Sequence, residues 1–344
     1  MIFNVIGFEN KELWSKIVKN GEIYYQWEYV DAFFKNGDGI PKLAYAQEGL
    51  EYVYNVFLLR DIAHDLELDC KKYKFFDIIT PYGYGGVNAN TQSKILIDFF
   101  FEKFEEYCIN NNIISEFVRL NPLLNNQKFY NIDYNINKIA QTIFIKLDNP
   151  DQIWCDMESR ARNTIRKARS FNLKIKYGFN KEFMDEFKEI YKDTMYRDSA
   201  DLYYFFNNDF YESILKNLKD NARIYTVYFN NKPINSNLII FNGNNAHYHL
   251  SGTLSDYMKL GANSFALYEI SLDLYNKGFK KFHLGGGYGG DNSPLFKFKK
   301  SFNKFGELDF YIGKKIFNIN NYKKLFNVKN IEISENYFPA YRRS

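Results

Sequence analysis

The chain has 344 residues, about twice the roughly 150 residues of a typical domain, so its length favours two domains over one. Apolar residues make up 46% of the chain and charged residues 25%, a globular composition that excludes disorder, collagen and coiled coil. The 45 basic and 41 acidic side chains leave a net charge of +4, so any site for a polyanion must be local.

The cysteines and the N-terminus indicate the compartment. Cys70, Cys108 and Cys155 are widely spaced and form no C-x-x-C motif, which argues against a disulfide framework and a zinc site. The N-terminus lacks a basic segment followed by a long apolar one, and no stretch approaches the roughly 18 apolar residues of a membrane-spanning helix. We therefore expect a cytoplasmic protein with reduced thiols.

The first half of the chain starts its regular structure with a hairpin. Two β-rich runs, residues 42–47 and 52–60, are joined by the turn-forming Glu48-Gly49-Leu50-Glu51. The elements expected next are a strand over 74–79, a helix over 91–110 and a strand over 116–120. This order predicts an α/β half-domain.

The middle of the chain holds its densest group of basic side chains. A helix predicted over 156–170 carries Arg160, Arg162, Arg166, Lys167 and Arg169. Residues three and four apart share a helix face, so Arg162, Arg166 and Arg169 form a stripe that could meet phosphates. The alternative is a solvated helix face between two domains. Two further helices are expected, over 182–196 and 209–218.

The second half repeats the order of the first with clearer turn signals. Strands over 223–229, 234–241 and 247–251 predict a three-stranded meander. They are followed by a helix that starts within residues 259–263, runs to about Asn276 and stops at Lys277-Gly278. The elements expected after it are a strand over 281–284, a glycine-rich run over 285–290, an extended or helical run over 295–302 and a strand over 307–312. The predicted fold class is α/β (α+β), with two duplicated halves, each a mixed, mostly antiparallel sheet flanked by helices.

Several of these motifs resemble the FemABX peptidyltransferases, which are tandem acyltransferase-fold (GNAT) proteins that move amino acids from aminoacyl-tRNA onto peptidoglycan precursors. The resemblance implies GNAT-like domains at 1–150 and 151–305, with the catalytic site in the second, and a tail at 306–344 that packs back on the first. The motifs are residues 160–168, 191–197, Tyr248 and Gly252 in the meander, Leu284-Gly-Gly-Gly287, 295–302 and, in the first half, Arg119-Leu-Asn-Pro122.

Acyl transfer to an amine passes through a tetrahedral oxyanion, which needs a cation or hydrogen-bond donor beside it. In the resembling family a Phe-Lys pair supplies the lysine ammonium and the phenylalanine backbone N–H, and Phe298-Lys299 occupies the matching place. The alternative is an exposed cationic face over packed phenylalanines. The resemblance also implies that Tyr248 is an acceptor-site hydroxyl, with a half-buried strand tyrosine as the alternative.

Three histidines fall on two predicted strands that could be neighbours. His247 and His249 alternate along one strand and so share a face, while His283 lies on the other. Without an acidic ligand motif we expect no metal site. His249 is a candidate general base, because an ordinary histidine pKa suits amine deprotonation near neutral pH. The acidic alternatives, which spacing does not separate, are Glu158, Asp193, Asp198 and Asp291.

Two glycine motifs bear on the acyl donor. Gly285, Gly286 and Gly287 allow close approach to a ligand, or form a structural turn, but lack the ending of a P-loop. Gly261, in Lys259-Leu-Gly-Ala-Asn263, stands where acyl-CoA-dependent acetyltransferases bind pyrophosphate on helix-terminal N–H groups. Asn263 departs from the small residue that ends the usual motif, which favours a different donor.

Arg197 ends the motif over residues 191–197. In members of the resembling family, a cation after this motif holds the pyrophosphate of a nucleotide-linked precursor. Here residues 198–204 read Asp-Ser-Ala-Asp-Leu-Tyr-Tyr, so the acceptor stays open among a muropeptide, an amino sugar and a lipid-linked surface glycan.

Three hypotheses follow. The first is aminoacyl transfer from tRNA to a cell-wall or glycan precursor, with Arg160, Arg162, Arg166 and Lys167 on RNA phosphates. The second is N-acetyl transfer from acyl-CoA bound near Gly261, and the third is a non-catalytic glycan- or peptide-binding module. We expect no permanently bound cofactor, no DNA partner and at most peripheral membrane contact.

Overall fold

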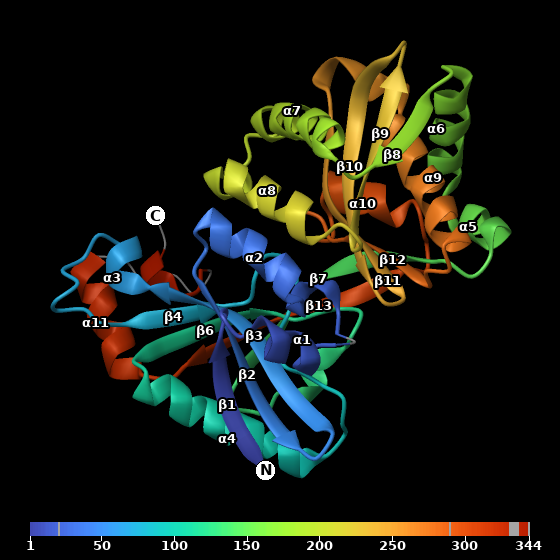
Figure 1. The fold of residues 1–344 in the computed structure, drawn as a ribbon. Coiled ribbons are helices and arrows are strands. Elements are labelled where there is room, and N and C mark those ends of the chain that lie inside the picture. The colour runs from blue at the N-terminus through green and yellow to red at the C-terminus, as the bar shows by residue number, and fades with distance from the viewer. Residues whose placement is uncertain (20, 289, 330–336, 343–344) are drawn as a thin grey trace. The chain divides into compact units, whose positions relative to one another are not determined.

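The computed structural model of the chain describes residues 1–19, 21–288, 290–329 and 337–342 and forms two compact units (Figure 1). One comprises Met1–Ile139 with Phe310–Ser344, and the other comprises Ala140–Asp309. The chain crosses between them inside strands β7 (Asn135–Lys146) and β13 (Glu307–Ile316). The predicted boundaries at 150 and 305 differ from these crossings because a continuous strand carries no turn residues that would mark a boundary within it.

The sheet of the first unit has the strand order β1-β2-β3-β4-β6-β13. All neighbours are antiparallel except β4 and β6, which are parallel. Helix α4 (Lys94–Asn110) packs on this sheet through Leu96, Phe100 and Phe104. The other elements are β1 (Ile2–Gly7), α1 (Lys11–Ile17), α2 (Trp27–Asn36), β2 (Ile40–Glu48), β3 (Glu51–Asp61), α3 (Ile62–Asp65), β4 (Phe76–Ile79), β5 (Asn88–Ala89), β6 (Ile113–Arg119) and α11 (Ile319–Lys329).

The sheet of the second unit has the strand order β7-β12-β11-β10-β9-β8, in which only β11 and β12 are parallel. Helices α6 and α9 lie on one side of it, and α7 and α8 on the other (Figure 1). The elements are α5 (Pro150–Asp156), α6 (Ser159–Ser170), β8 (Lys174–Gly178), α7 (Lys181–Arg197), α8 (Asn208–Asn217), β9 (Ala222–Phe229), β10 (Lys232–Asn242), β11 (Asn245–Thr253), α9 (Ala262–Asn276), β12 (Lys281–Gly285) and α10 (Pro294–Lys300).

The mixed α/β fold class, the hairpin, the meander and the order of the helices are confirmed. The basic helix predicted over 156–170 is confirmed as α6, but it begins at Ser159 because the extended backbone of Met157 and Glu158 separates it from α5. The run over 295–302, left open between extended and helical, contains helix α10. No helix in the described part of the chain has both the length and the apolar character to cross a membrane.

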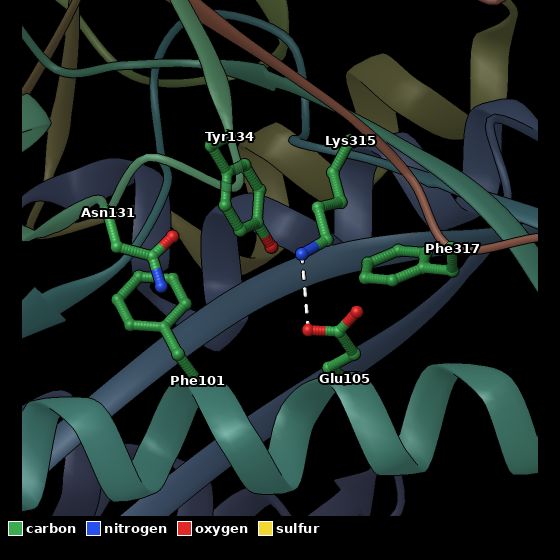
Figure 2. A pocket seen from close by; sticks show the side chains of 6 residues that line it. All are labelled: Phe101, Glu105, Asn131, Tyr134, Lys315 and Phe317. Atoms are coloured by element: carbon green, nitrogen blue, oxygen red, sulfur yellow. Dashed lines mark hydrogen bonds and ion pairs between the residues drawn. The ribbon is translucent and has the colours of Figure 1, made fainter.

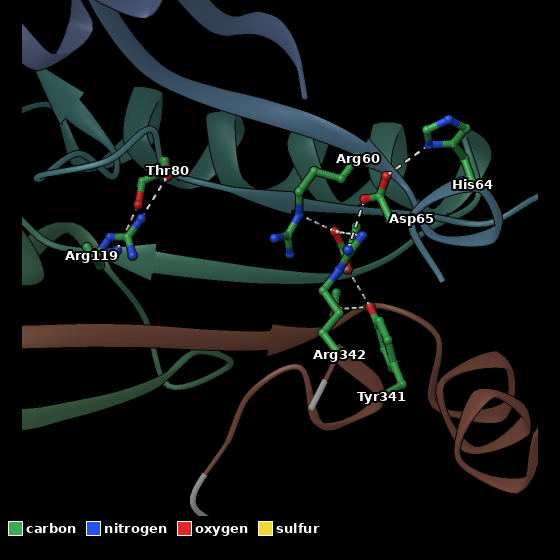
Figure 3. A network of polar contacts seen from close by, with 9 residues as sticks. Arg60, His64, Asp65, Thr80, Arg119, Tyr341 and Arg342 are labelled. Atoms are coloured by element: carbon green, nitrogen blue, oxygen red, sulfur yellow. Dashed lines mark hydrogen bonds and ion pairs between the residues drawn. The ribbon is translucent and has the colours of Figure 1, made fainter. Parts of the chain in front are cut away.

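Residues near the C-terminus join the sheet of the first unit through Asp77, a fully buried carboxylate on β4 (Figure 3). Arg60 Nε lies 2.7 Å from one oxygen of this carboxylate, and Arg342 Nε lies 2.5 Å from the other. The Tyr341 hydroxyl donates to Asp77 at 3.0 Å and lies 2.8 Å from Ser115 Oγ on β6. A buried charge with two cationic partners holds residues 341 and 342 against β4 and β6.

A second buried acid, Glu116, lies on β6 beneath α4. Tyr134 Oη donates to it at 2.6 Å and Asn55 Nδ2 at 2.9 Å. Burial raises the pKa of Glu116 to about 7, although these hydrogen bonds and Lys315 oppose the rise. Lys315 pairs with Glu105 at 3.1 Å beside a cavity of about 10 Å³, enough for a single water, whose lining Figure 2 shows.

We expect Glu116→Gln to stabilise the first unit increasingly as pH rises. The folded protein holds the Glu116 proton more tightly than an ordinary glutamate of pKa 4.5, so the wild-type free energy of unfolding falls as pH rises between these two pKa values. Glutamine removes this penalty, and its amide can donate to Asn55 Oδ1, which has no hydrogen-bond partner among the described residues.

Denaturant unfolding at several values between about pH 4 and 8 measures the difference between the variant and the wild type. Glu48→Gln, at an exposed position of β2, is the control. A pH-independent difference for Glu116→Gln would contradict the prediction.

Candidate active site

The two parallel strands of the second unit part at the candidate active site. β11 and β12 pair only at residues 245–247 and 281–283, after which β11 continues to Thr253 and β12 ends at Gly285. At the same point the register of β11 against β10 shifts, so that His249 is the extra residue of a bulge. Bulges re-aim side chains and are frequent beside active sites.

The parallel pair of the first unit stays closed. Beyond the end of β4, Gly85 bridges to Leu120, and its N–H donates to Arg119 O at 2.7 Å. The Arg119 N–H donates to Thr80 Oγ1 at 3.1 Å, and its guanidinium donates to Thr80 O at 3.4 Å (Figure 3). Among the described residues, therefore, only those of the second unit combine parted parallel strands with a bulge at the point of parting.

Lys299 is buried at the end of α10. Ser293 caps the helix, since its Oγ accepts the Phe296 N–H at 3.2 Å, and Pro294 suits the first turn. The Lys299 side chain is only 8% exposed, and its Nζ donates to Gly286 O at 2.7 Å. Burial lowers the pKa of Lys299 to about 8, so the amine is still mostly protonated at neutral pH.

The exposed cationic face offered as the alternative does not describe Lys299, although it does describe Lys297 on the same helix. The expected role of the Phe298 N–H needs correction. Phe298 lies within α10, where the backbone N–H bonds to the carbonyl four residues earlier and is not available as a second oxyanion donor. The side chain of Phe298 packs on Phe302, with ring centres 5.2 Å apart.

Tyr248 lies on β11 beside Lys299, whose Nζ is 5.9 Å from the centre of its ring. Its hydroxyl oxygen is 2.5 Å from Ser251 Oγ and 3.0 Å from Asn263 Oδ1. Burial raises the pKa of Tyr248, so the phenol keeps its proton at neutral pH. The structure thus brings together Lys299, Tyr248 and Gly286 from three separate elements.

His249 lacks the near-neutral pKa on which its expected role as a base depended. Burial, with a smaller contribution from His247, lowers the pKa of His249 to about 3. Burial also lowers the pKa of His283, whose Nε2 lies 2.9 Å from Thr142 Oγ1. Both rings are neutral and weakly basic. Within the described residues, no three His, Cys, Asp or Glu side chains group closely enough to hold a metal ion.

The glycine-rich loop packs tightly against its surroundings. A Cβ added at Gly287 would lie 2.0 Å from Ser293 Oγ, and one at Gly286 would lie 3.0 Å from Gln141 O. Gly285 has a left-handed φ of +75°, and Asp291 Oδ1 accepts the Gln141 N–H at 2.6 Å. The loop therefore places the Gly286 carbonyl against Lys299, while Gly289 lies outside the described residues.

Gly261 brings two helices close together. It has φ +70° just before α9, and a Cβ there would lie 2.7 Å from Thr164 Cγ2 on α6. The positive φ and the close contact with α6 explain why position 261 is a glycine. Binding of a CoA pyrophosphate beside it stays a prediction. Asn263, two residues later, directs its side-chain oxygen to Tyr248. The sequence did not predict this contact, and its one signal was the asparagine in place of the small residue of the acetyl-CoA motif.

The arginine stripe of α6 contacts its own unit. Arg162 Nη1 donates to Met157 O at 2.5 Å, beside the end of α5. Arg166 lies over the Trp154 ring at 5.3 Å, and Arg169 pairs with Glu269 at 2.9 Å. Arg166 and Arg169 remain exposed beside α5 and α9, so binding of phosphates by the stripe stays a prediction.

The remaining basic candidates differ in what they contact. Arg160 pairs with Glu158 at 2.7 Å and donates to Lys297 O at 2.5 Å, which links α6 to α10. Lys167 is exposed. Arg197 Nη1 donates to Thr253 O at 2.7 Å, and its Nε pairs with Asp198 at 2.9 Å, so it fastens the end of β11 to α7.

Comparison with known proteins agrees with this geometry. Residues 158–300 match the family model described as an acetyltransferase (GNAT) domain. A search of curated proteins finds no match. Among solved structures, the chain is similar to FemX at 13% identity and a TM-score of 0.65, over 95% of this chain and 99% of FemX.

Two further structures with this fold carry related names. One is the C-terminal domain of an Agrobacterium fabrum protein named as a lysylphosphatidylglycerol synthetase, at 12% identity and a TM-score of 0.59, over 93% of this chain and 96% of that one. The other is L-PGS from Bacillus licheniformis, at 12% identity and a TM-score of 0.59, over 90% and 92%. At these identities the similarity shows the fold.

The chain carries a GNAT acetyltransferase domain over residues 158–300, within its second unit. Its architecture is that of the FemABX-like tandem GNAT proteins, which confirms the resemblance seen in the sequence motifs. The expectation of an enzyme is confirmed at the level of acyl transfer.

We expect Gly252→Ala to loosen the end of β11. A Cβ at Gly252 would lie 2.6 Å from the Ile190 carbonyl oxygen, a backbone atom of α7 that cannot swing away. Overpacking of this kind costs about 1–3 kcal/mol of unfolding free energy. The control is Gly243→Ala in an open turn, where only the positive φ of 56° is penalised. Equal losses in chemical denaturation would contradict the packing role of Gly252.

Proposed function

We propose that this chain transfers an aminoacyl group from aminoacyl-tRNA to an amine of a cell-wall or surface-glycan precursor, with Lys299 stabilising the oxyanion. The observation that carries the proposal is the burial of the Lys299 ammonium beside the parted strands. An ammonium has three N–H donors, and Gly286 O is its one hydrogen-bond acceptor among the described residues. Two N–H groups are left to meet a ligand.

The proposed chemistry balances without a cofactor. The amine nitrogen attacks the carbonyl carbon of the aminoacyl ester, and the carbonyl oxygen becomes an oxyanion beside Lys299. Collapse of this intermediate forms the amide, breaks the bond to the ribose oxygen and leaves the amine proton on that hydroxyl. Because Phe298 donates its N–H within α10, we assign the charge stabilisation to Lys299 alone.

Two observations favour an aminoacyl donor. The name of the structurally similar lysylphosphatidylglycerol synthetase joins an amino acid to a lipid headgroup. Asn263 replaces the small residue of the acetyl-CoA motif and turns its side chain towards β11. An acceptor carried on a lipid would require peripheral membrane contact, and a tRNA donor places the reaction in the cytoplasm.

The second candidate is an N-acetyltransferase that takes acyl-CoA near Gly261 and acts on an amino sugar or another amine. The family model described as an acetyltransferase domain favours it. This candidate keeps Lys299 in the same role and changes only the donor.

We expect Lys299→Met to lower kcat by about 100-fold or more, because one fixed oxyanion donor contributes roughly 3 kcal/mol. Turnover is measured with tRNA charged with radiolabelled amino acids, or with acetyl-CoA, and a panel of amines that includes an amino sugar. Lys297→Met is the matched control, since Lys297 is exposed on the same helix.

The wild-type rate should also fall as pH rises above about 8, where Lys299 loses its proton. If Lys299→Met and Lys297→Met keep equal turnover, Lys299 does not stabilise the oxyanion.

The donor can be identified by the salt dependence of binding. Contacts to RNA phosphates release counterions, so affinity for charged tRNA should fall at least about tenfold between roughly 50 and 200 mM salt. Lys167→Gln on exposed α6 should weaken tRNA binding, whereas Lys216→Gln on α8 should not. Saturable acetyl-CoA binding by calorimetry, with flat salt dependence for tRNA, would favour the acetyltransferase.

A further inference from the structure

A row of amide side chains runs through the second unit to the Tyr248 hydroxyl. It consists of Asn237 and Asn235 on β10 and Asn263 in the first turn of α9. Asn235 and Asn237 are completely buried, next to the apolar residues 238–240 of the same strand. Amides in such surroundings are costly unless they are hydrogen-bonded. Asn237 Nδ2 donates to Asn235 Oδ1 at 2.8 Å, and Asn235 Nδ2 donates to Asn263 Oδ1 at 3.4 Å.

A backbone carbonyl fixes the direction of this row. Asn235 Nδ2 donates to Gly252 O at 2.7 Å and to Thr253 Oγ1 at 2.9 Å. A carbonyl oxygen only accepts, so the nitrogen of Asn235 must face Gly252 and its oxygen must face Asn237. The two Nδ2 protons of Asn235 are shared among three acceptors, of which Asn263 Oδ1 is the most distant at 3.4 Å, and facing this donor group Asn263 presents its oxygen.

The orientation of Asn263 decides where the Tyr248 proton points. An amide oxygen only accepts, so the hydroxyl 3.0 Å away donates its single proton to Asn263 Oδ1. The Tyr248 oxygen keeps its lone pairs for other donors. A bound amine would be such a donor, while Ser251 Oγ, 2.5 Å away, is a second acceptor within reach of the phenolic proton.

We propose that Asn263, oriented by Asn235, is a positioning residue for acyl transfer: it directs the Tyr248 proton away from the substrate, so that the Tyr248 oxygen accepts a hydrogen bond from the attacking amine. This inference rests on the function proposed above and concerns the amine side of the same site. The Tyr248 ring lies 5.9 Å from Lys299 Nζ, so the oriented phenol and the ammonium act on one substrate. It also gives a reason for an asparagine where the acetyl-CoA motif has a small residue.

A double-mutant cycle tests whether Asn263 acts through Tyr248. The variants are Tyr248→Phe, Asn263→Ala and the combination, assayed with the donors and amines named above. Each single change should lower kcat/KM for the amine about tenfold, the effect of one lost hydrogen bond, and leave the KM of the donor unchanged. The double variant should match Tyr248→Phe within about twofold, because Asn263 has nothing left to orient.

A substrate-free measurement tests the contact itself. With 3-fluorotyrosine placed at position 248, the ¹⁹F resonance should move when Asn263 is changed to Ala. It should stay in place for Asn276→Ala, a change at the exposed far end of the same helix.

The outcomes separate the failure of this inference from failure of the function. An unmoved ¹⁹F resonance means that the contact is absent and overturns the inference, while acyl transfer can stand. A moved resonance with additive losses in the cycle assigns Asn263 a merely structural role and also overturns it. Absence of transfer by the wild type with either donor overturns the proposed function, and this inference with it.

Discussion

The site depends on keeping one ammonium out of water. Removing an ammonium from solvent costs several kcal/mol even after relaxation, and the pKa of Lys299 falls to about 8 as a result. The charged form persists because Gly286 O accepts one of its N–H groups and the Tyr248 ring lies beside it. A developing oxyanion would supply the acceptor that the remaining N–H groups lack. The desolvation that disfavours the charged form of Lys299 therefore also strengthens the attraction between its ammonium and the oxyanion formed during acyl transfer.

This requirement explains the sequence around Lys299. The Gly286 carbonyl reaches the ammonium only if the loop lies flat against β7 and the start of α10, which leaves no room for a Cβ at Gly287. The Asp291 carboxylate holds the end of this loop on the Gln141 N–H. Glycine-rich runs bind phosphate in other proteins, but in this chain the tight packing of the run positions the Gly286 carbonyl.

Much of the fold follows from the sequence because turns, caps and apolar periodicity are local signals. The meander and α9 are examples. The burial of Lys299 is not evident from the run that holds it, because Lys297, Lys299 and Lys300 lie close together there. Which of the three side chains turns inward depends on the start of α10, which Ser293 caps. The low pKa of His249 results from tertiary burial and a bulge, neither of which periodicity predicts. The contacts of the arginine stripe likewise depend on how α5 and α9 pack beside α6.

The two units show how one arrangement of strands can be structural or reactive. In the first unit the parallel pair β4–β6 is closed beyond the end of β4 by the Gly85 N–H, which donates to Arg119 O, and by the Thr80 hydroxyl, which accepts the Arg119 N–H. In the second unit β11 and β12 separate, and side chains serve the polar groups near the end of β11: Asn235 and Arg197 donate to the carbonyls of Gly252 and Thr253. Side-chain donors leave room for a substrate where backbone pairing does not. Where side chains take the place of a neighbouring strand as donors, buried amides such as Asn235 are needed in an otherwise apolar sheet. The polar row and the parted strands therefore occur in the same unit.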